Sequence, residues 1–254
     1  MRLTLCVVTA VTIAAAGPCS FAGVQVTAQS AALQRIDLAE RLSAGAMRAV
    51  NREIQPIAEV AGAVHLGAQP GPGVAWIEGT NFSEGTIELD IRGRDVFQQS
   101  FVGVAFHRRD DATYDAVYLR PFNFRAGDPV RHGHAVQYVA VPDHDWPRLR
   151  KEFPEEFENP VDASVSPTGW IPVRIVVKGG KIEVFVGAVT APALAVRKLA
   201  PHPGGMIGLW VGNGSDGSFA NLRVMRPLRG ATWLPLARLC RVVAERADGW
   251  ARRL

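Results

Sequence analysis

The sequence has little cysteine, with three residues in a chain of 254. Cys6 and Cys19 lie in an N-terminal stretch with the pattern of a removable leader, so the mature chain would keep only Cys240. A single cysteine forms no internal disulfide, and small disulfide-rich extracellular modules are therefore excluded. The stability of the folded chain must come from its apolar core.

Apolar runs long enough to span a bilayer are also missing. Arg2 and the apolar segment Leu3–Ala16 are followed by small residues near Ser20–Ala22 and Val26–Ala28, which is the pattern of a secretory signal peptide. A retained anchor is disfavoured because the run is shorter than the roughly 20 residues that a membrane-spanning helix needs. We therefore expect residues 1–28 to be a signal peptide and the protein to be periplasmic or secreted from a bacterium.

Charge of one sign is not concentrated anywhere in the sequence. The formal net charge is +4, and the lysines and arginines are spread along the chain. The basic stripe typical of a nucleic-acid-binding surface is missing, so we expect no nucleic-acid partner. An apolar share of 48% is enough for the core of one large all-β domain or of two small ones.

What the sequence does contain is a series of short strand-like runs. Turn signals such as Lys178-Gly179-Gly180 separate them, and no helical pattern lies between them. This arrangement is typical of an all-β fold, a two-sheet antiparallel jelly-roll sandwich, rather than of a parallel α/β sheet. The expected strands are Arg52–Glu59, Ala63–Ala68, Val74–Glu78, Thr86–Arg92, Phe101–His107, Asp115–Pro121, Ala135–Val141, Trp170–Val177, Lys181–Val186, Met206–Val211 and Ser218–Met225.

The domain organisation follows from these runs. We expect the jelly roll over residues 51–227, after an N-terminal arm at residues 29–50. Residues 228–254 form a tail in which apolar residues from Leu236 to Trp250 recur at helical spacing, which predicts a C-terminal amphipathic helix. Packing of this helix on the domain is favoured over peripheral contact with a membrane surface.

Alternation along the strands sorts small and large polar side chains onto one face. Val102, Val104 and Phe106 are expected to face the core, as are Val117 and Leu119 of the next run. The residues expected on the opposite face are Gly103, Ala105 and His107, then Ala116, Tyr118 and Arg120, and, from a later run, Gly208 and Trp210. Small residues beside large polar ones predict a lined groove on this face of the sheet.

Four segments carry a family resemblance. They are Gly85-Thr86-Ile87-Glu88-Leu89-Asp90, Phe101–His107, Tyr114-Asp115-Ala116-Val117-Tyr118-Leu119-Arg120-Pro121 and Gly208-Leu209-Trp210-Val211-Gly212, and the motifs of the final strands, Gly205–Leu209 and Phe219-Ala220-Asn221-Leu222, add to it. Together they resemble the concanavalin A-like lectin/glucanase superfamily, and most of all exported bacterial laminin-G-like and 3-keto-disaccharide hydrolase-like domains. The resemblance covers Val74 to Val224. It implies a two-sheet jelly roll whose concave sheet holds a sugar, as an enzyme in some members and as a lectin in others.

Two features of that superfamily are missing from the sequence. The Glu-x-Asp-x-x-Glu signature of the classical glucanases is absent, so their retaining mechanism is not expected. No clean calcium loop is visible either, although Asn213 and Asp216 could supply oxygen ligands to a structural calcium ion. No other cofactor is expected.

The predicted groove face brings together groups suited to a sugar. An aromatic ring covers the apolar face of a pyranose, while Arg, His, Asn and Gln side chains make directed hydrogen bonds to hydroxyl groups or to a carboxylate. The expected ligand-binding residues are Tyr118, Asn123, Gln137, Tyr138, Trp146 and Trp210. The alternative is that these are ordinary strand residues that face the solvent and bind no ligand.

Catalytic candidates come from the histidines and from the polar excursion at residues 142–167. On a strand, His132 and His134 would face the same way, as in a pair that binds zinc or transfers a proton. The alternative is that both are exposed loop residues. The excursion carries acidic residues and Trp146, and its carboxylates either serve as a general acid and base or are simply solvated. The expected catalytic residues are His107 or His134 as the base, Arg120 to stabilise negative charge, and Asp143.

The sequence therefore predicts an exported carbohydrate-active protein that binds a glycan in the groove, either without cleaving it or as a hydrolase or lyase. The alternatives are a non-catalytic carbohydrate-binding or adhesion module and a structural envelope protein. An oligo- or polysaccharide is the expected partner.

Overall fold

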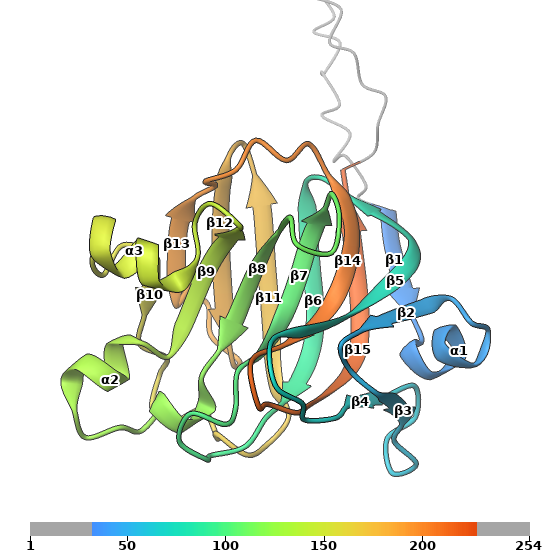
Figure 1. Ribbon diagram of the computed structural model, residues 1–254, viewed down its shortest axis with the longest axis horizontal. Coiled ribbons are helices and arrows are strands. Elements are labelled where there is room, and N and C mark those ends of the chain that lie inside the picture. The colour runs from blue at the N-terminus through green and yellow to red at the C-terminus, as the bar shows by residue number, and fades with distance from the viewer. Residues whose placement is uncertain (1–31, 228–254) are drawn as a thin grey trace, which may run out of the picture.

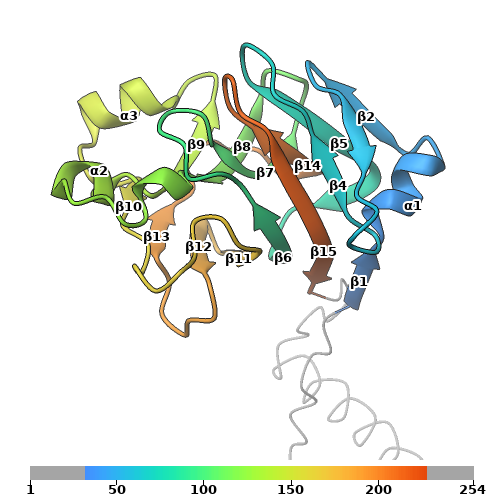
Figure 2. The ribbon, with the colours of Figure 1, turned by 90° about the horizontal axis from the view of Figure 1, so that it is seen from below.

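The computed structural model describes residues 32–227, which form a sandwich of two antiparallel sheets (Figures 1 and 2). The all-β jelly-roll prediction is confirmed. The predicted signal peptide and C-terminal helix lie outside the described residues. Within those residues, no helix combines the length and the apolar character needed to cross a membrane.

The first sheet, here called the groove sheet, has the strand order β10-β9-β8-β7-β14-β5-β2. Its strands are β2 (Met47–Val50), β5 (Gly73–Phe82), β7 (Val102–Arg108), β8 (Tyr114–Leu119), β9 (Val136–Val141), β10 (Glu158–Asn159) and β14 (Gly205–Val211). Helix α1 (Leu38–Ser43) lies beyond the β2 end of this sheet, whereas α2 (Pro129–Gly133) and α3 (Trp146–Glu152) lie at the β9 and β10 end (Figure 1).

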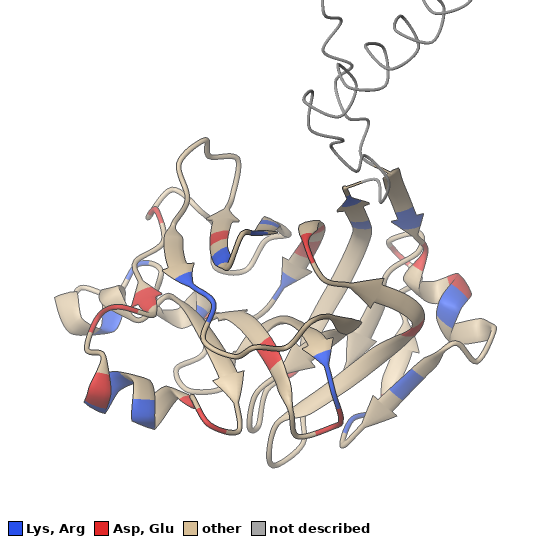
Figure 3. Cartoon of the chain, turned by 90° about the horizontal axis from the view of Figure 1, so that it is seen from above, with Lys and Arg blue, Asp and Glu red and all other residues tan. Residues whose placement is uncertain are grey.

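The second sheet, here called the back sheet, has the order β13-β12-β11-β6-β15-β4-β3, with β1 paired to β15. Its strands are β1 (Ala32–Ile36), β3 (Ile54–Pro56), β4 (Val64–Leu66), β6 (Gly85–Arg92), β11 (Ile171–Lys178), β12 (Lys181–Val186), β13 (Leu194–Arg197) and β15 (Gly217–Arg226). The 11 expected strands are all present, with ends shifted by a few residues, and β1, β2, β10 and β13 are additional. Charged residues of both signs are interspersed along the described chain (Figure 3).

The core lies between the two sheets and follows the alternation in the sequence. Ile87, Leu89 and Ile91 of β6 are buried, and Ile87 and Leu89 stand opposite Ile175 and Val173 of β11. The valines of β7 and β8 close the core from the other side. Each fully buried side chain of this kind contributes about 1.5–3 kcal/mol, so a chain without a disulfide can be held by this interior.

Residues 32–50, which we expected to form an arm, are built into both sheets. Strand β1 pairs with β15 of the back sheet, and β2 pairs with β5 of the groove sheet. Between them, α1 begins at Asp37, whose side chain accepts a hydrogen bond from the Glu40 amide, and it buries Leu38.

The excursion at residues 142–167 is folded rather than structureless. Asp145 caps the N-terminus of α3, and Pro147 occupies its first turn, where a missing N–H costs nothing. Leu149 and Phe157 are buried against the sandwich. Glu158 and its neighbour form β10, which pairs with β9. These contacts bring the helix and its polar residues to the edge of the groove sheet.

Candidate functional site

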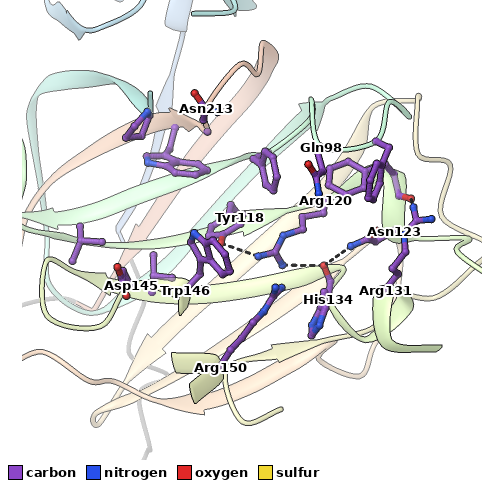
Figure 4. A pocket seen from close by; sticks show the side chains of 18 of the residues that line it. Gln98, Tyr118, Arg120, Asn123, Arg131, His134, Asp145, Trp146, Arg150 and Asn213 are labelled. Atoms are coloured by element: carbon purple, nitrogen blue, oxygen red, sulfur yellow. Dashed lines mark hydrogen bonds between the residues drawn. The ribbon is translucent and has the colours of Figure 1, made fainter. Parts of the chain in front are cut away.

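A cavity of about 640 Å³ lies on the outward face of the groove sheet (Figure 4). Its floor comes from the sheet, and its walls come from the loop before β7, the segment between β8 and β9, and α3. The principal lining residues are Phe97, Gln98, Phe101, Tyr114, Tyr118, Arg120, Phe122, Asn123, Arg131, His134, Asp145, Trp146, Arg150, Trp210 and Asn213. We call this cavity the groove.

The floor of the groove is a row of touching aromatic rings. The Tyr118 and Trp210 rings lie 4.8 Å apart at an angle of 32°. The Trp210 indole N–H donates to the Tyr114 hydroxyl at 3.2 Å, and Phe101 continues the row with its centroid 6.3 Å from that of Tyr118. Edge and offset contacts of this kind fix the orientation of the rings. The floor is therefore a rigid apolar surface with polar tips.

A glycine makes room for this floor. Gly103 stands between Tyr118 on β8 and Trp210 on β14 in the registers of the two strand pairs. A Cβ atom at this position would lie 2.6 Å from the Tyr118 Cα atom and closer still to the Val117 carbonyl oxygen. Only glycine allows β7 and β8 to approach this closely.

A buried guanidinium group stands beside the aromatic floor. Arg120 is 4% exposed, and its Nη2 donates to the Tyr118 hydroxyl at 3.0 Å and to the Gln137 side-chain oxygen. Its Nη1 donates to the His134 carbonyl at 2.9 Å. Burial lowers the pKa of Arg120 from its ordinary value, but an arginine stays protonated in a protein. The groove therefore contains a fixed positive charge.

One carboxylate, that of Glu158, joins the cationic groups below the groove. Glu158 is 5% exposed, and Arg150 donates to both of its oxygens, at 2.7 and 2.9 Å. Arg120 Nη1 also reaches Glu158, at 3.4 Å, and the His134 Nδ1 atom lies 2.9 Å from it. Burial is the main cause that lowers the pKa of His134, so this imidazole is neutral near pH 7.

Two exposed aromatic side chains stand at the rim. Trp146, at the start of α3, is 50% exposed, and the Arg150 guanidinium lies 5.1 Å from its ring. Phe97, on the loop before β7, is 55% exposed, and the Arg131 guanidinium lies 4.4 Å from its ring. Each rim position therefore presents an apolar face next to a positive charge.

Most of the predicted site residues meet in the groove. The six that line it are Tyr118, Arg120, Asn123, His134, Trp146 and Trp210. Gln137 lies directly beneath, where it accepts a hydrogen bond from the Tyr118 hydroxyl at 2.8 Å. The structure brings these residues together from β8, β9, β14, α3 and the segment between β8 and β9.

The prediction that His107 faces the groove is wrong. A bulge in β7 places Phe106 and His107 together opposite Ile207, and the backbone of His107 adopts a positive φ of 55°. The imidazole turns into the sandwich, where it is fully buried and bonds to Asp115 at 2.6 Å and to the Ser83 carbonyl at 2.9 Å. It does not line the groove.

The placement of Tyr138 in the groove is also wrong. Tyr138 stands opposite Val117 in the β8–β9 register and therefore faces the interior, where its hydroxyl donates to Asp115 at 2.8 Å. Asp143 lies exposed in the turn after β9, outside the lining, and its carbonyl accepts a hydrogen bond from Arg148. Asp145, two residues further along, takes the lining position.

The expected pairing of His132 with His134 fails because the two residues do not lie on a strand. His132 belongs to α2, and its Nε2 lies 3.2 Å from the Val161 carbonyl, while His134 ends the helix and faces Glu158. Among the described residues, no group of three or more His, Cys, Asp or Glu side chains is placed to hold a metal ion.

The donors expected for calcium are engaged by protein groups. The Asn213 side-chain oxygen accepts the Gly71 N–H at 2.7 Å. The Asp216 carboxylate lies 2.6 Å from Arg94 Nε and 3.8 Å from His65 Nε2. Both side chains are therefore turned toward protein donors.

Sequence reasoning missed the charged residues of the walls. Glu158 is one acidic residue among several in the excursion, and nothing local marks Arg150 as its partner or Arg131 as a residue of the groove wall. Their roles depend on how α3 and α2 pack on the groove sheet, which spacing along the chain does not encode.

Comparison with known proteins identifies the fold class. No family model matches the sequence, and no curated protein matches it. A Bacillus subtilis protein of unknown function with a galectin-like fold superposes with a TM-score of 0.54 at 13% identity, covering 80% of this chain and 99% of that one. The carbohydrate binding module CBM66 from Bacillus subtilis gives 0.50 at 13% identity, covering 70% of this chain and 95% of that one.

The exoplasmic/lumenal domain of VIP36, solved in a form with bound Ca²⁺ and Man3GlcNAc, also gives a TM-score of 0.50, at 10% identity, covering 76% of this chain and 88% of that one. Identities this low establish the fold alone. The protein has a concanavalin A-like jelly-roll fold, as the four sequence segments implied, and its function must be argued from the groove.

Proposed function

We propose that this protein binds a carbohydrate in the groove. The observation that carries the proposal is the half-exposed ring of Trp146, which lines the groove together with the buried guanidinium of Arg120. Sugar rings pack their C–H faces on aromatic rings, and their hydroxyl groups accept hydrogen bonds from fixed donors. The volume of about 640 Å³ lies within the range of about 300–1,000 Å³ that ligand sites occupy.

Relatives in fold support the same proposal. A carbohydrate-binding module and a domain solved with bound Man3GlcNAc share this architecture. Fold likeness raises the expectation of a sugar ligand, and the composition of the groove supplies the physical reason for it. We place the activity outside the cytoplasm on the pattern of residues 1–28.

Binding without cleavage by a carboxylate pair is the favoured form. Glycosidic hydrolysis of the usual kind needs two carboxyl groups flanking the bond, about 5–9.5 Å apart. Both oxygens of Glu158 accept hydrogen bonds from Arg150, and an oxygen of Asp145 accepts the Arg148 amide N–H at 3.1 Å as the cap of α3. Asp145 is then the one carboxylate in the described lining, and the groove presents no pair of them.

A lyase is the second candidate, because one groove residue has the properties of a base. His134 lines the groove, its lowered pKa keeps it neutral, and the Arg120 guanidinium group bonds to its carbonyl. In such a reaction, His134 would remove the proton from the carbon next to a sugar carboxylate, and the freed electron pair would form a carbon–carbon double bond as the C–O bond to the leaving sugar breaks. The leaving oxygen would take up a proton from water. Formation of an ultraviolet-absorbing carbon–carbon double bond distinguishes this reaction from binding alone.

The test is a binding screen of the mature chain against neutral and acidic oligo- and polysaccharides, with product analysis. We expect saturable binding that weakens by about tenfold or more in Trp146→Ala, because this variant removes the exposed ring on which a sugar would stack. Trp170→Ala is the matched control, because Trp170 precedes β11 on the back sheet, where Arg92 covers its ring. Absence of binding to every glycan, or equal losses in the two variants, would contradict the proposal.

A further inference from the structure

We infer that the groove selects carbohydrates that carry an anionic group, either a carboxylate or a sulfate ester. This inference rests on the proposed function and names its ligand class. Its basis is an imbalance of charge around the groove and a set of buried polar atoms without partners.

The imbalance is visible in the groups that line the groove. Three guanidinium groups, those of Arg120, Arg131 and Arg150, face it together with one lining carboxylate, that of Asp145. Counting Glu158 beneath the floor gives three positive charges against two negative ones. His134 adds no positive charge near pH 7 because its pKa is lowered. One positive charge is therefore left over.

The excess charge lies where water screens it poorly. Arg120 and Glu158 are buried, and the Arg150 side chain is 32% exposed. Arg150 already bonds to both Glu158 oxygens, so Arg120 obtains only the longer contact of 3.4 Å with that carboxylate. A charge that is withdrawn from water and only partly compensated is stabilised by any anion that can reach it.

Unpartnered atoms around the groove match the same kind of ligand. The Gln137 Nε2 atom and the Arg131 Nε atom are buried donors without a hydrogen-bond partner. Gln137 accepts a hydrogen bond from Arg120. Arg131, on α2, lines the groove (Figure 4). The buried Asn123 Oδ1 atom is an acceptor without a partner, which suits a sugar hydroxyl. Donors in excess of acceptors favour an acceptor-rich anion.

The aromatic ring of Trp146 at the rim indicates where the anionic group would lie relative to the sugar ring. Trp146 is half exposed beside Arg150, and in Figure 4 both side chains extend toward Arg120. A sugar ring that stacks on Trp146 would place a ring substituent near the guanidinium groups. A planar carboxylate or a sulfate at that position can accept two hydrogen bonds from an arginine.

The test compares each acidic polysaccharide of the screen with its own neutralised form. Carboxyl reduction turns a uronate polymer into a neutral polymer with the same linkages, and desulfation does the same for a sulfated galactan. We expect the acidic parent to bind about tenfold or more tightly than its neutral form, with affinity falling as salt is raised. A loss of affinity on carboxyl reduction identifies a carboxylate as the recognised group, and a loss on desulfation identifies a sulfate ester.

Single substitutions test whether the arginines of the groove cause the preference for acidic glycans. Arg150→Gln and, separately, Arg131→Gln should reduce the acidic-over-neutral preference by about tenfold. Arg148→Gln is the matched control, because this substitution removes the same charge from the same helix. Arg148 does not line the groove. Arg131→Gln leaves Glu158 and its partners intact, so it stays informative if Arg150→Gln fails to fold.

The outcomes separate this inference from the proposed function. Neutral glycans that bind as well as their acidic parents, with Trp146→Ala still weakening them, would overturn the charge selectivity and leave carbohydrate binding standing. An acidic preference that Arg148→Gln reduces as much as Arg150→Gln would also overturn it, since the groove would not be its source. Failure of every glycan to bind would remove both proposals.

Discussion

Arg150 holds Glu158 through two parallel hydrogen bonds, Nε to Oε1 at 2.7 Å and Nη2 to Oε2 at 2.9 Å. The pair joins α3 to β10 and so fastens the excursion to the edge of the groove sheet. Because Glu158 also neutralises part of the buried Arg120 charge, this carboxylate connects the wall of the groove with its floor.

Removal of this carboxylate should destabilise the fold. In Glu158→Gln, Arg120 stays buried without a counter-charge, and we expect a loss of about 3–5 kcal/mol in the free energy of unfolding, measured in urea. Glu152→Gln is the control, because it breaks the exposed Arg148–Glu152 pair, which is worth about 0–1 kcal/mol. Equal losses in the two variants would show that the buried position of Glu158 is unimportant.

The buried Asp115 carboxylate should be structural and not part of binding. It accepts from the Tyr138 hydroxyl and bonds to His107, and all three side chains lie inside the sandwich. We expect Asp115→Ala to cost about 2–5 kcal/mol of unfolding free energy by leaving two buried polar groups unsatisfied.

His107→Gln tests the corrected position of the imidazole. We expect lower stability together with unchanged glycan affinity in the fraction that remains folded, measured at low temperature. If the folded His107→Gln protein has lost affinity for the glycan, the interior position of His107 is contradicted.

Gly103 should tolerate no side chain. In Gly103→Ala the new Cβ atom meets the backbone of Tyr118 and Val117, so β7 and β8 must separate, at a cost of about 1–3 kcal/mol. Thermal unfolding measures the loss. Gly127→Ala, where a Cβ atom would have no neighbour within 4 Å, should leave the midpoint nearly unchanged. If the two alanine variants are equally stable, the close approach of the strands is not required.

The lowered pKa of His134 predicts a pH dependence of stability. Since burial keeps the folded imidazole neutral, the unfolded chain takes up the proton first as the pH falls below about 6.5. The stability of the wild-type protein should therefore decline with acid in that range, and His134→Gln should show a shallower decline. Urea unfolding at a series of pH values checks this, and identical slopes in the two proteins would contradict it.

The strands and their faces follow from the sequence because each is a local pattern of period two. Tyr118 and Arg120 reach the groove because alternation runs unbroken along β8. The same rule fails at His107, where one extra residue in β7 reverses the face. A signal for this was present: Asp115 alternates with Val117 and Leu119 on the core side, and a buried carboxylate needs a partner.

The walls of the groove could not be predicted in this way. Glu158, Arg150 and Arg131 come from segments without strand alternation, and their contacts arise only when the excursion and α2 pack on the sheet edge. A charge pair between elements depends on tertiary packing, so neither propensity nor spacing reveals it.

The most direct test of carbohydrate binding in the groove is a titration of the ¹⁵N-labelled protein with the tightest-binding oligosaccharide of the screen, monitored through the tryptophan indole NMR signals. The signals of Trp146 and Trp210, which line the groove, should shift and saturate together, while that of Trp170 on the back sheet should stay in place. A ligand that shifts Trp170 and leaves Trp146 and Trp210 unmoved would contradict the account.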